Sequence, residues 1–416
     1  MNVIILGAGL SGCETALQLA NRGITVDLYE MKPVKYSTAH KSENFAELVC
    51  SNSFGKELSS TANGVLINEL QMLESYLLQI AKQYRTSHIG ELVVDREKFS
   101  KEVTRQILEN PNIKVHRELI TQIPKGDVVV IATGPLTDVK LAQHFEVVFG
   151  KDNLSFQDST CPIIYGDSID TNNVQICKTS NGITISLTEE QFNIIAEKLR
   201  GAKTRINTDD KTIELPQCSP IEYLAKKDIK TLLEVKFAQT LERTKDNFAT
   251  VTLRKENSAG QSYSIAGFMT QMTQESQRRV IRAIPGLERC KFARYGRSHR
   301  NTFLNAPKIL NKFLKANEKC YIIGQLSGID GYIPAIATGL MATYSIMAEY
   351  QNEILIEFPK NTILGGFSNY ITAANENFSP MIASFHLIES AKDSYDSSRK
   401  ALSKWIKESK IFHITG

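Results

Sequence analysis

The sequence predicts an α/β protein whose main domain is built from both ends of the chain, with a smaller α+β domain inserted between them. Three observations support this fold class: a strand, glycine turn, helix and second strand at the N-terminus, a second glycine-rich turn near the C-terminus, and a different texture in between. The 416 residues also exceed what one hydrophobic core usually organises. We expect residues 1–158 and 286–416 to form the main domain and residues 159–285 the insertion.

The N-terminal unit, residues 3–30, reads VIILGAGLSGCETALQLANRGITVDLYE. A short apolar run leads into glycines with the GxGxxG spacing, and a helical segment and a second apolar strand follow. This order is typical of a Rossmann-type turn whose helix N-terminus faces a pyrophosphate, while the acid that ends the second strand accepts hydrogen bonds from a ribose. The candidate dinucleotide contacts are Gly7, Ala8, Gly9, Leu10, Ser11, Gly12 and Glu30.

The stretch after this unit is a polar loop, Met31 to Ser60, which contains the run NFAELVCSNSFG. A loop this long inside a compact domain is usually functional. Asn63 is then expected to cap one long amphipathic helix whose apolar stripe runs from Val65 to Ile80. A second helix is expected from Arg96 to Glu109.

Two further turns bear on the identity of the dinucleotide. The apolar strand Asp127 to Ile131 ends in an ATGP turn, and a short strand near the C-terminus feeds the glycine-rich run GQLSGIDGYIPAIATG, Gly324 to Gly339. A nicotinamide dehydrogenase needs only the first glycine turn, whereas FAD enzymes of the glutathione-reductase type close over the flavin with a C-terminal strand and helix. FAD is therefore favoured over NAD, with Gly134, Gly324, Asp330 and Gly331 as further candidate contacts.

Composition limits the other possibilities. The net charge is +4, from 49 basic and 45 acidic residues, so any RNA-binding surface must be a local patch. The 7 cysteines show no CxxC pairing, which argues against a disulfide framework and against a bound metal. The first strand starts at the N-terminus, and no apolar run approaches the ~20 residues of a membrane span. We expect a soluble, cytoplasmic protein with no membrane contact, and infer no partner protein.

Two cysteines and one basic segment are candidates for chemistry. Cys218 lies between two prolines in LPQCSPIEYLA, which disfavours helix, and Cys50 lies in the long polar loop. Either thiol becomes a nucleophile only as the thiolate, beside a cation or a helix N-terminus; the alternative is a small packed side chain. The segment KFARYGRSHRNTFLNAPK, residues 291–308, alternates basic and aromatic residues, which suits stacked bases, a flat anionic cofactor or simply a solvated loop.

Several segments carry a family resemblance, in this order: GAGLSGCETALQLANRGITVDLYEMKP, AHKSENFAELVCSNS, VDREKFS, VIATGPLT, CSPIE, YGRSHRNTFLNAPKIL and GQLSGIDGY. Together they resemble the TrmFO family of folate- and FAD-dependent tRNA (uracil-5-)-methyltransferases, relatives of the GidA-type flavoproteins. The similarity runs over nearly the whole chain, and the ELVCSNS and HRNTF segments are far more specific than the glycine motif.

The resemblance implies a reaction. Methylenetetrahydrofolate would donate a one-carbon unit to a uridine in the T-loop of tRNA, and reduced FAD, recharged by NADPH or NADH, would supply the reducing equivalents. Carbon-5 of uracil is a poor nucleophile, but a thiolate that adds to carbon-6 turns the ring into an enolate, and a second group must later remove the carbon-5 proton. The target base must leave its stack to reach such a pocket.

The resemblance also implies residue roles. Cys218 would be the attacking thiol and Cys50 the proton-transfer partner, with the reverse assignment as the alternative. His299 would stack on the folate and hold it against the flavin together with Arg300. Local basic residues would bind the RNA backbone.

The chain departs from the family pattern at several positions. Asp330 replaces a glutamate, and Pro334 is expected to interrupt the helix start that follows. The other departures are Ile382, Ser384 and His386 within PMIASFHL, residues 380–387, and the run RKEN at residues 254–257. These changes leave three alternatives open: the same chemistry on ribosomal RNA, an inactive flavoprotein paralogue that binds RNA or folate, and a plain NAD(P)H-flavin oxidoreductase acting on a small molecule.

Overall fold

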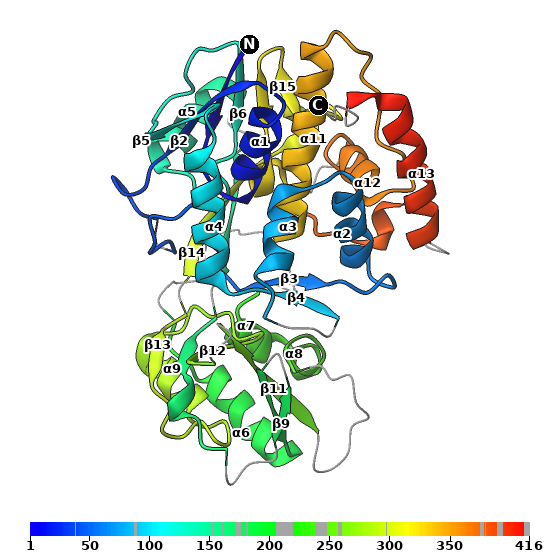
Figure 1. The fold of residues 1–416 in the computed structure, drawn as a ribbon. Coiled ribbons are helices and arrows are strands. Elements are labelled where there is room, and N and C mark those ends of the chain that lie inside the picture. The colour runs from blue at the N-terminus through cyan, green and yellow to red at the C-terminus, as the bar shows by residue number, and fades with distance from the viewer. Residues whose placement is uncertain are drawn as a thin grey trace.

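The computed structural model has two domains, which Figure 1 shows one above the other. It describes residues 1–37, 39–86, 90–150, 153–159, 161–171, 176–179, 182–204, 219–237, 248–256, 260–296, 298–374, 378, 380–388 and 394–411. Residues 153–159, 176–179 and 298–301 are described by their backbone alone.

The first domain is organised around a six-stranded sheet in the order β15-β16-β6-β1-β2-β5. Its strands are parallel except for the edge strand β15, which is antiparallel to β16. Their bounds are β1 Asn2–Leu6, β2 Thr25–Glu30, β5 Ile113–Arg117, β6 Val128–Ile131, β15 Lys315–Asn317 and β16 Cys320–Ile322. Strands from both ends of the chain therefore lie side by side, as the fold class predicts.

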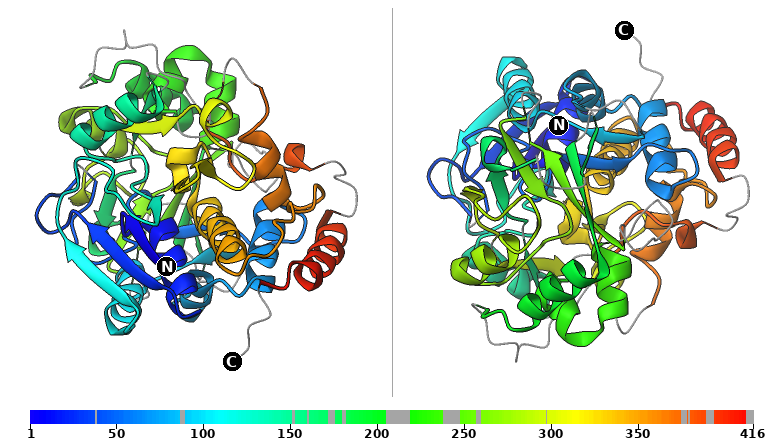
Figure 2. Two further views of the ribbon diagram at one scale, coloured as in Figure 1. Left: turned by 90° about the horizontal axis from the view of Figure 1, so that it is seen from above. Right: turned by 90° about the horizontal axis from the view of Figure 1, so that it is seen from below.

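Helices cover this sheet and extend the domain to one side. The helices are α1 Leu10–Ala20, α2 Ala62–Met72, α3 Tyr76–Gln83, α4 Arg96–Glu109, α5 Val139–Phe149, α10 Ala306–Ile309, α11 Tyr332–Tyr350, α12 Ile363–Tyr370 and α13 Ser394–Ser409. A short ladder of β3, Ser53–Lys56, with β4, Glu91–Val93, lies on the side that faces the second domain. Figures 1 and 2 show α13, coloured red, on the flank of the first domain, away from the insertion.

The inserted domain has its own antiparallel sheet, ordered β13-β8-β12-β11-β10-β9, and its own hydrophobic core. Its strands are β8 Ile163–Tyr165, β9 Ile176–Thr179, β10 Gly182–Leu187, β11 Ala249–Lys255, β12 Ser262–Ile265 and β13 Phe292–Arg294. Its helices are α6 Glu189–Arg200, α7 Ile221–Lys227, α8 Ile229–Lys236 and α9 Gln274–Ile281. The two chain crossings between the domains, β7 Asn153–Ser159 and β14 Ser298–Leu304, pair antiparallel. The division at residues 158 and 285 stays a prediction beside these observed strands.

The long helix expected after Asn63 is in fact two helices, α2 and α3, and its cap is a different residue. The hydroxyl of Thr61 accepts from Gly64 N–H at 3.1 Å, whereas the amide of Asn63 donates to the carbonyls of Phe54 and Lys56 in β3. The helix is interrupted at Glu74, whose φ is +56°. The buried carboxylate of Glu14 accepts from the N–H groups of Tyr76 and Leu77 at 3.1 and 2.9 Å and so caps α3 separately.

Pro334 does not interrupt the helix after the second glycine turn. Helix α11 begins at Tyr332, so Pro334 lies in its first turn, where a proline costs no hydrogen bond because the N–H would have no partner there. The N-terminus of α11 is therefore regular and begins directly after Gly331.

Candidate active site

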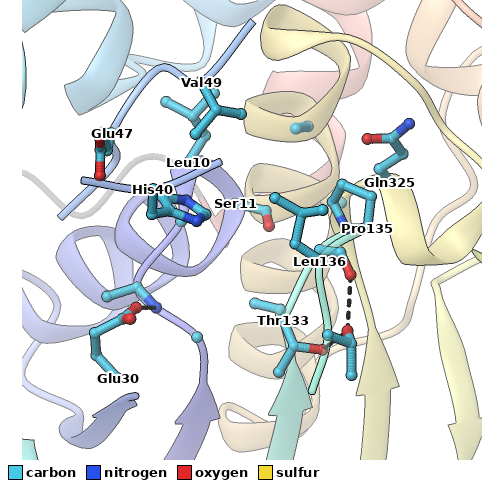
Figure 3. Close-up of a pocket in the computed structure, with 18 of the residues that line it drawn as sticks. Leu10, Ser11, Glu30, His40, Glu47, Val49, Thr133, Pro135, Leu136 and Gln325 are labelled. Carbon is cyan, nitrogen blue, oxygen red and sulfur yellow. Dashed lines mark hydrogen bonds between the residues drawn. The ribbon is translucent and has the colours of Figure 1, made fainter. Parts of the chain in front are cut away.

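A cavity of about 430 Å³ lies between the glycine turns of the first domain, within the volume range of small-molecule sites. Figure 3 shows labelled side chains from four separate segments around it: the N-terminal turn, the loop after β2, the ATGP turn and the C-terminal turn. The predicted residues that line it are Gly7, Ala8, Gly9, Leu10, Ser11, Glu30, Cys50, Gly134, Gly324, Asp330 and Gly331. Gly12 is the one candidate cofactor residue of the sequence that does not line it.

Glycine is required in the N-terminal turn for two different reasons. Gly7 has φ +101°, and a Cβ there would lie 2.6 Å from the Ala132 carbonyl oxygen at the end of β6. A Cβ on Gly12 would lie 2.0 Å from the Gly7 carbonyl oxygen. Gly12 therefore acts by letting α1 pack against the turn, whereas a Cβ on Gly9 would meet only Ala132 O at 4.0 Å.

Glu30 is buried at the end of β2, and both of its carboxylate oxygens already accept backbone hydrogen bonds. Oε2 accepts from Ala8 N–H and Oε1 from Lys32 N–H, each at 3.0 Å. The carboxylate thus ties the glycine turn to the start of the next loop, a role that the sequence did not indicate. Each oxygen keeps a further lone pair, so the predicted contact with a ribose stays a prediction.

The C-terminal glycine turn packs directly on the N-terminal one. Gly324 has φ +71°, and a Cβ there would lie 2.7 Å from the Ser11 hydroxyl oxygen. Beyond it, Met381 N–H donates to Gly328 O and Asp330 N–H donates to Met381 O, both at 2.9 Å. The segment after Pro380 is therefore fixed beside the turn, and Ile382 lines the cavity with Asp330.

The loop around Cys50, residues 47–53, forms the opposite wall of the cavity and is anchored to α11. The phenol oxygen of Tyr332 accepts from Cys50 N–H at 2.8 Å and from Ser51 N–H at 3.2 Å, and donates to Ser51 O at 3.2 Å. Burial raises the pKa of Tyr332, so the phenol stays protonated and can donate. Cys50 is half-buried and lines the cavity.

The inserted domain holds the same loop from its other side. Arg294, at the end of β13, donates from Nη2 to Val49 O at 3.0 Å. The buried amide of Asn52 donates to Lys255 O in β11 and, at 3.2 Å, to Val94 O in the first domain. The Cys50 loop is thus held by both domains at once.

Two buried or half-buried ion pairs close the junction around this loop. Arg96 Nη2 in α4 lies 2.7 Å from Glu256 Oε2, and Arg254 Nη2 in β11 lies 2.8 Å from Glu91 Oε1. Several buried polar atoms nearby have no hydrogen-bond partner among the described residues: Arg96 Nε, Glu256 Oε1, Arg294 Nε and Asn52 Oδ1. The junction is therefore strongly polar although little of it is exposed.

Three predicted site residues cannot be placed in the same way. Cys218 lies outside the described residues, and so do the side chains of His299 and Arg300. The described chain resumes at Ser219, and Ile221 N–H donates at 2.8 Å to the carbonyl of Met269, which lines the cavity. The backbone of β14 passes the ATGP turn, where Thr302 N–H donates to Pro135 O at 2.8 Å.

Sequence reasoning missed the residues that hold the Cys50 loop, Asn52, Arg294 and Tyr332, and the ion pair of Arg96 with Glu256 at the junction beside it. Tyr332 and Arg294 fall inside segments that drew attention for other reasons, the second glycine turn and the basic aromatic run. Arg294 is 245 residues from its partner Val49, and Tyr332 is 282 residues from its partner Cys50. No local sequence pattern identifies either residue as an anchor for a loop so far away along the chain.

Two features are absent from the described part of the chain. It contains no helix that is long and apolar enough to cross a membrane. It also contains no group of three or more histidine, cysteine, aspartate or glutamate residues arranged to hold a metal ion.

The fold and the cavity define a two-domain α/β protein of the dinucleotide-binding flavoprotein class. A family profile described as "Glucose inhibited division protein A" matches residues 2–354. The solved structure of Aquifex aeolicus GidA (form II crystal) superposes with a TM-score of 0.73 at 14% identity and covers 99% of this chain and 73% of that chain. At that identity the likeness shows the fold alone.

Two curated relatives are each called "Methylenetetrahydrofolate--tRNA-(uracil-5-)-methyltransferase TrmFO". The protein of Lactobacillus johnsonii is 39% identical over 401 residues, 93% of this chain and 91% of that protein. The protein of Anoxybacillus flavithermus is 41% identical over 400 residues, 93% of this chain and 92% of that protein. The chain belongs to the TrmFO family.

Proposed function

We propose that this protein methylates carbon-5 of a uridine in the T-loop of tRNA, with methylenetetrahydrofolate as the carbon donor and FAD, recharged by NADPH or NADH, as the reductant. The single observation that carries the proposal is the position of Cys50, in the wall of the cavity that the two glycine turns form. The activity in the names of the relatives supports the substrate and the donor.

The residues around the cavity fit a bound FAD. The N-terminus of α1 presents the N–H groups of Leu10 and Ser11 where a pyrophosphate would lie, and Gly9 carries no Cβ that would fill the space. Glu30 would accept from the ribose, while Gly324, Asp330 and Gly331 would face the flavin end beside the N-terminus of α11. When bound and reduced, FAD supplies the two electrons that convert a methylene group into a methyl group.

The reaction needs one thiolate and one base. The thiolate adds to carbon-6 of uracil, so a C–S bond forms as the C5–C6 double bond breaks; carbon-5 then bonds to the methylene carbon as the first of the two C–N bonds that hold this carbon in the folate breaks. The base removes the carbon-5 proton as the second C–N bond breaks, which releases tetrahydrofolate and leaves an exocyclic methylene group. Addition of a hydride equivalent to this methylene forms the methyl group and expels the thiolate from carbon-6. We assign the attack to Cys218 and the proton transfer to Cys50, with the reverse assignment as the alternative.

The remaining assignments follow from the family motif. His299 would stack on the folate and Arg300 would bind its charged groups, with local basic residues contacting the RNA backbone. The segment that carries both residues runs beside the ATGP turn of the cavity, which supports this placement. We place the reaction in the cytoplasm.

The test is a reconstituted assay. The purified protein is incubated with FAD, NADPH, methylenetetrahydrofolate and either an unmodified tRNA transcript or a ribosomal RNA fragment, and 5-methyluridine is measured by nucleoside mass spectrometry. We expect 5-methyluridine in the tRNA only, and its loss in Cys218→Ala. If only the ribosomal fragment is methylated, the substrate is ribosomal RNA and not tRNA. If neither RNA contains 5-methyluridine, the proposal is overturned.

A further inference from the structure

We propose that Arg294 is a positioning residue for Cys50: its guanidinium fixes the Cys50 loop through the Val49 carbonyl and stabilises the thiolate form of Cys50. The proposal rests on the proposed function in one respect: the thiolate of Cys50 has a role only if Cys50 is catalytic. The nearest established contact is the hydrogen bond of 3.0 Å from Arg294 Nη2 to Val49 O, one residue before Cys50.

Arg294 is incompletely paired for a guanidinium in such a position. Its Nε is buried and makes no hydrogen bond with the described residues, and within that part of the chain Arg294 forms no ion pair. A buried charge without a counter-charge is costly, so an arginine placed in this way usually has an anion to serve. Among the described residues, Glu256 acts on Arg294 electrostatically but is already paired with Arg96 at 2.7 Å.

Counting the charges at the junction shows what is missing. Arg254 is balanced by Glu91, which leaves Arg96 and Arg294 with the single carboxylate of Glu256. Glu256 pairs with Arg96 at 2.7 Å, and burial together with the charge of Arg96 lowers the pKa of Arg294. Arginine nevertheless remains protonated, so among the described residues these three arginines and two carboxylates carry a net charge of +1, and Lys236 beside Cys161 adds a further cation to the junction. A Cys50 thiolate, which interacts electrostatically with Arg294, would neutralise one of these excess positive charges.

The other titratable groups around Cys50 do not replace Arg294. Tyr332, from α11, stays a neutral phenol because burial raises its pKa. Glu47, from the same loop, lies 3.5 Å from Lys32 and also accepts from two backbone N–H groups, so its charge is already compensated. Asp330 and His40 line the same cavity.

Cys161 provides a natural comparison within the same junction. It interacts with Lys236, Arg254 and Arg294, yet burial raises the pKa of its thiol to about 11. A nearby guanidinium is therefore not sufficient, and access to the cavity is also required. Both cysteines are half-buried by exposed area, but only Cys50 lines the cavity and so has both.

The test follows the rate at which iodoacetamide alkylates Cys50 in the FAD-loaded full-length protein, read by peptide mass spectrometry across a pH series. In the wild type we expect the midpoint below the ordinary thiol value of about 8.5. In Arg294→Gln, whose amide can still donate to the Val49 carbonyl, we expect the midpoint to rise by about one unit, which is roughly tenfold slower alkylation at neutral pH. In Arg294→Lys the charge remains, so the midpoint should stay near that of the wild type.

Arg282→Met is the matched control, because Arg282 Nη2 also donates to the carbonyl of a cysteine, Cys290, at 3.2 Å but lies away from the cavity. It should leave the Cys50 midpoint unchanged. An unchanged midpoint in Arg294→Gln would overturn the proposal. If that variant does not fold, a wild-type midpoint at or above the ordinary thiol value would overturn it instead. Neither readout depends on methylation, so the proposed function can fail independently.

Discussion

The two walls of the cavity are built by opposite means. One wall consists of two closely packed glycine-rich turns: a Cβ on Gly12 would lie 2.0 Å from the Gly7 carbonyl oxygen of the same turn, and a Cβ on Gly324 would lie 2.7 Å from the Ser11 hydroxyl oxygen of the other turn. The other wall is the Cys50 loop, which is held by the side chain of Tyr332 from α11, by the side chain of Arg294 from β13, and by its own Asn52, whose amide donates to Lys255 O in β11. The first wall depends on the absence of side chains and the second on their presence.

This difference separates cofactor binding from chemistry. The glycine wall offers backbone N–H groups and the buried carboxylate of Glu30, which suit a dinucleotide. The loop wall offers a thiol whose backbone is fixed by Tyr332 and Arg294. Substitutions in the first wall should therefore affect flavin retention, and substitutions in the second should affect reactivity at similar flavin content.

The largest effect is expected for Gly12→Ala. A methyl group 2.0 Å from the Gly7 carbonyl oxygen forces α1 away from the turn, so we expect a loss of more than about 3 kcal/mol of unfolding free energy and a colourless protein. Thermal unfolding and the visible flavin spectrum measure both. Gly9→Ala is the matched control: its Cβ meets only Ala132 O at 4.0 Å, so it should fold normally and bind FAD more weakly. Equal stability of Gly12→Ala and the wild type would break the comparison.

The junction behind the loop should respond to charge balance. Arg96→Met breaks the 2.7 Å ion pair of the buried Glu256 carboxylate and leaves it only the weaker electrostatic interaction with Arg294, so we expect a cost of about 3 kcal/mol in denaturant unfolding. The double variant Arg96→Met/Glu256→Met removes both charges and should recover part of that loss. The two residues would be uncoupled if the losses of unfolding free energy in Arg96→Met and Glu256→Met simply added up in the double variant.

Tyr332→Phe should weaken the reaction while leaving the fold and the flavin in place. It removes the acceptor of Cys50 N–H and Ser51 N–H, and an unsatisfied buried donor costs about 1–3 kcal/mol. If that energy holds the loop in its reactive position, kcat/KM falls roughly tenfold to a hundredfold. The check is steady-state methylation at matched flavin content; lost flavin with unchanged turnover per bound flavin would contradict this role.

The smallest expected effect concerns Glu69, which lies away from both walls. Its carboxylate accepts from Ile363 N–H at 2.8 Å and Leu364 N–H at 3.1 Å and so caps α12, and burial raises its pKa to about 7. Because the folded state then holds the proton more tightly than the unfolded state, the free energy of unfolding should fall as pH rises from about 4.5 to about 7. Denaturant unfolding across this pH range measures it.

Glu69→Gln cannot ionise and should lose this part of the pH dependence, although it is less stable throughout because the amide nitrogen cannot accept the second N–H. An identical pH profile in both proteins would show that Glu69 does not titrate in this range. The comparison with Glu256 is direct, since one buried carboxylate is neutralised by a proton and the other by Arg96.

Much of the glycine wall could be predicted from the sequence because its determinants are local. The strand, the GxGxxG turn, the helix and Glu30 follow one another within the first 30 residues, and α4 was predicted with the bounds that the structure has, Arg96–Glu109. Even here the local signal had limits. The start of α3 is capped locally by the hydroxyl of Ser75, which accepts from Leu78 N–H, but also by Glu14 from another helix, which accepts from Tyr76 and Leu77 N–H.

The loop wall could be predicted only as far as Cys50 itself. Its position depends on Tyr332 and Arg294, which are 282 and 245 residues away along the chain from their partners in the loop. Periodicity and spacing describe neighbours in sequence, so they contain no information about such pairs. The segment that the sequence predicts only as a polar loop therefore lies, in the structure, at the junction between the two domains.

The Cys50→Ser variant tests the chemical role of the Cys50 loop most directly. It is assayed with FAD, NADPH, methylenetetrahydrofolate and a tRNA transcript, and flavin content and 5-methyluridine are measured on the same preparation. Because Cys50 belongs to the loop wall and not to the glycine wall, we predict the flavin content of the wild type and no detectable 5-methyluridine. Wild-type amounts of 5-methyluridine from Cys50→Ser would contradict the assignment of chemistry to this loop.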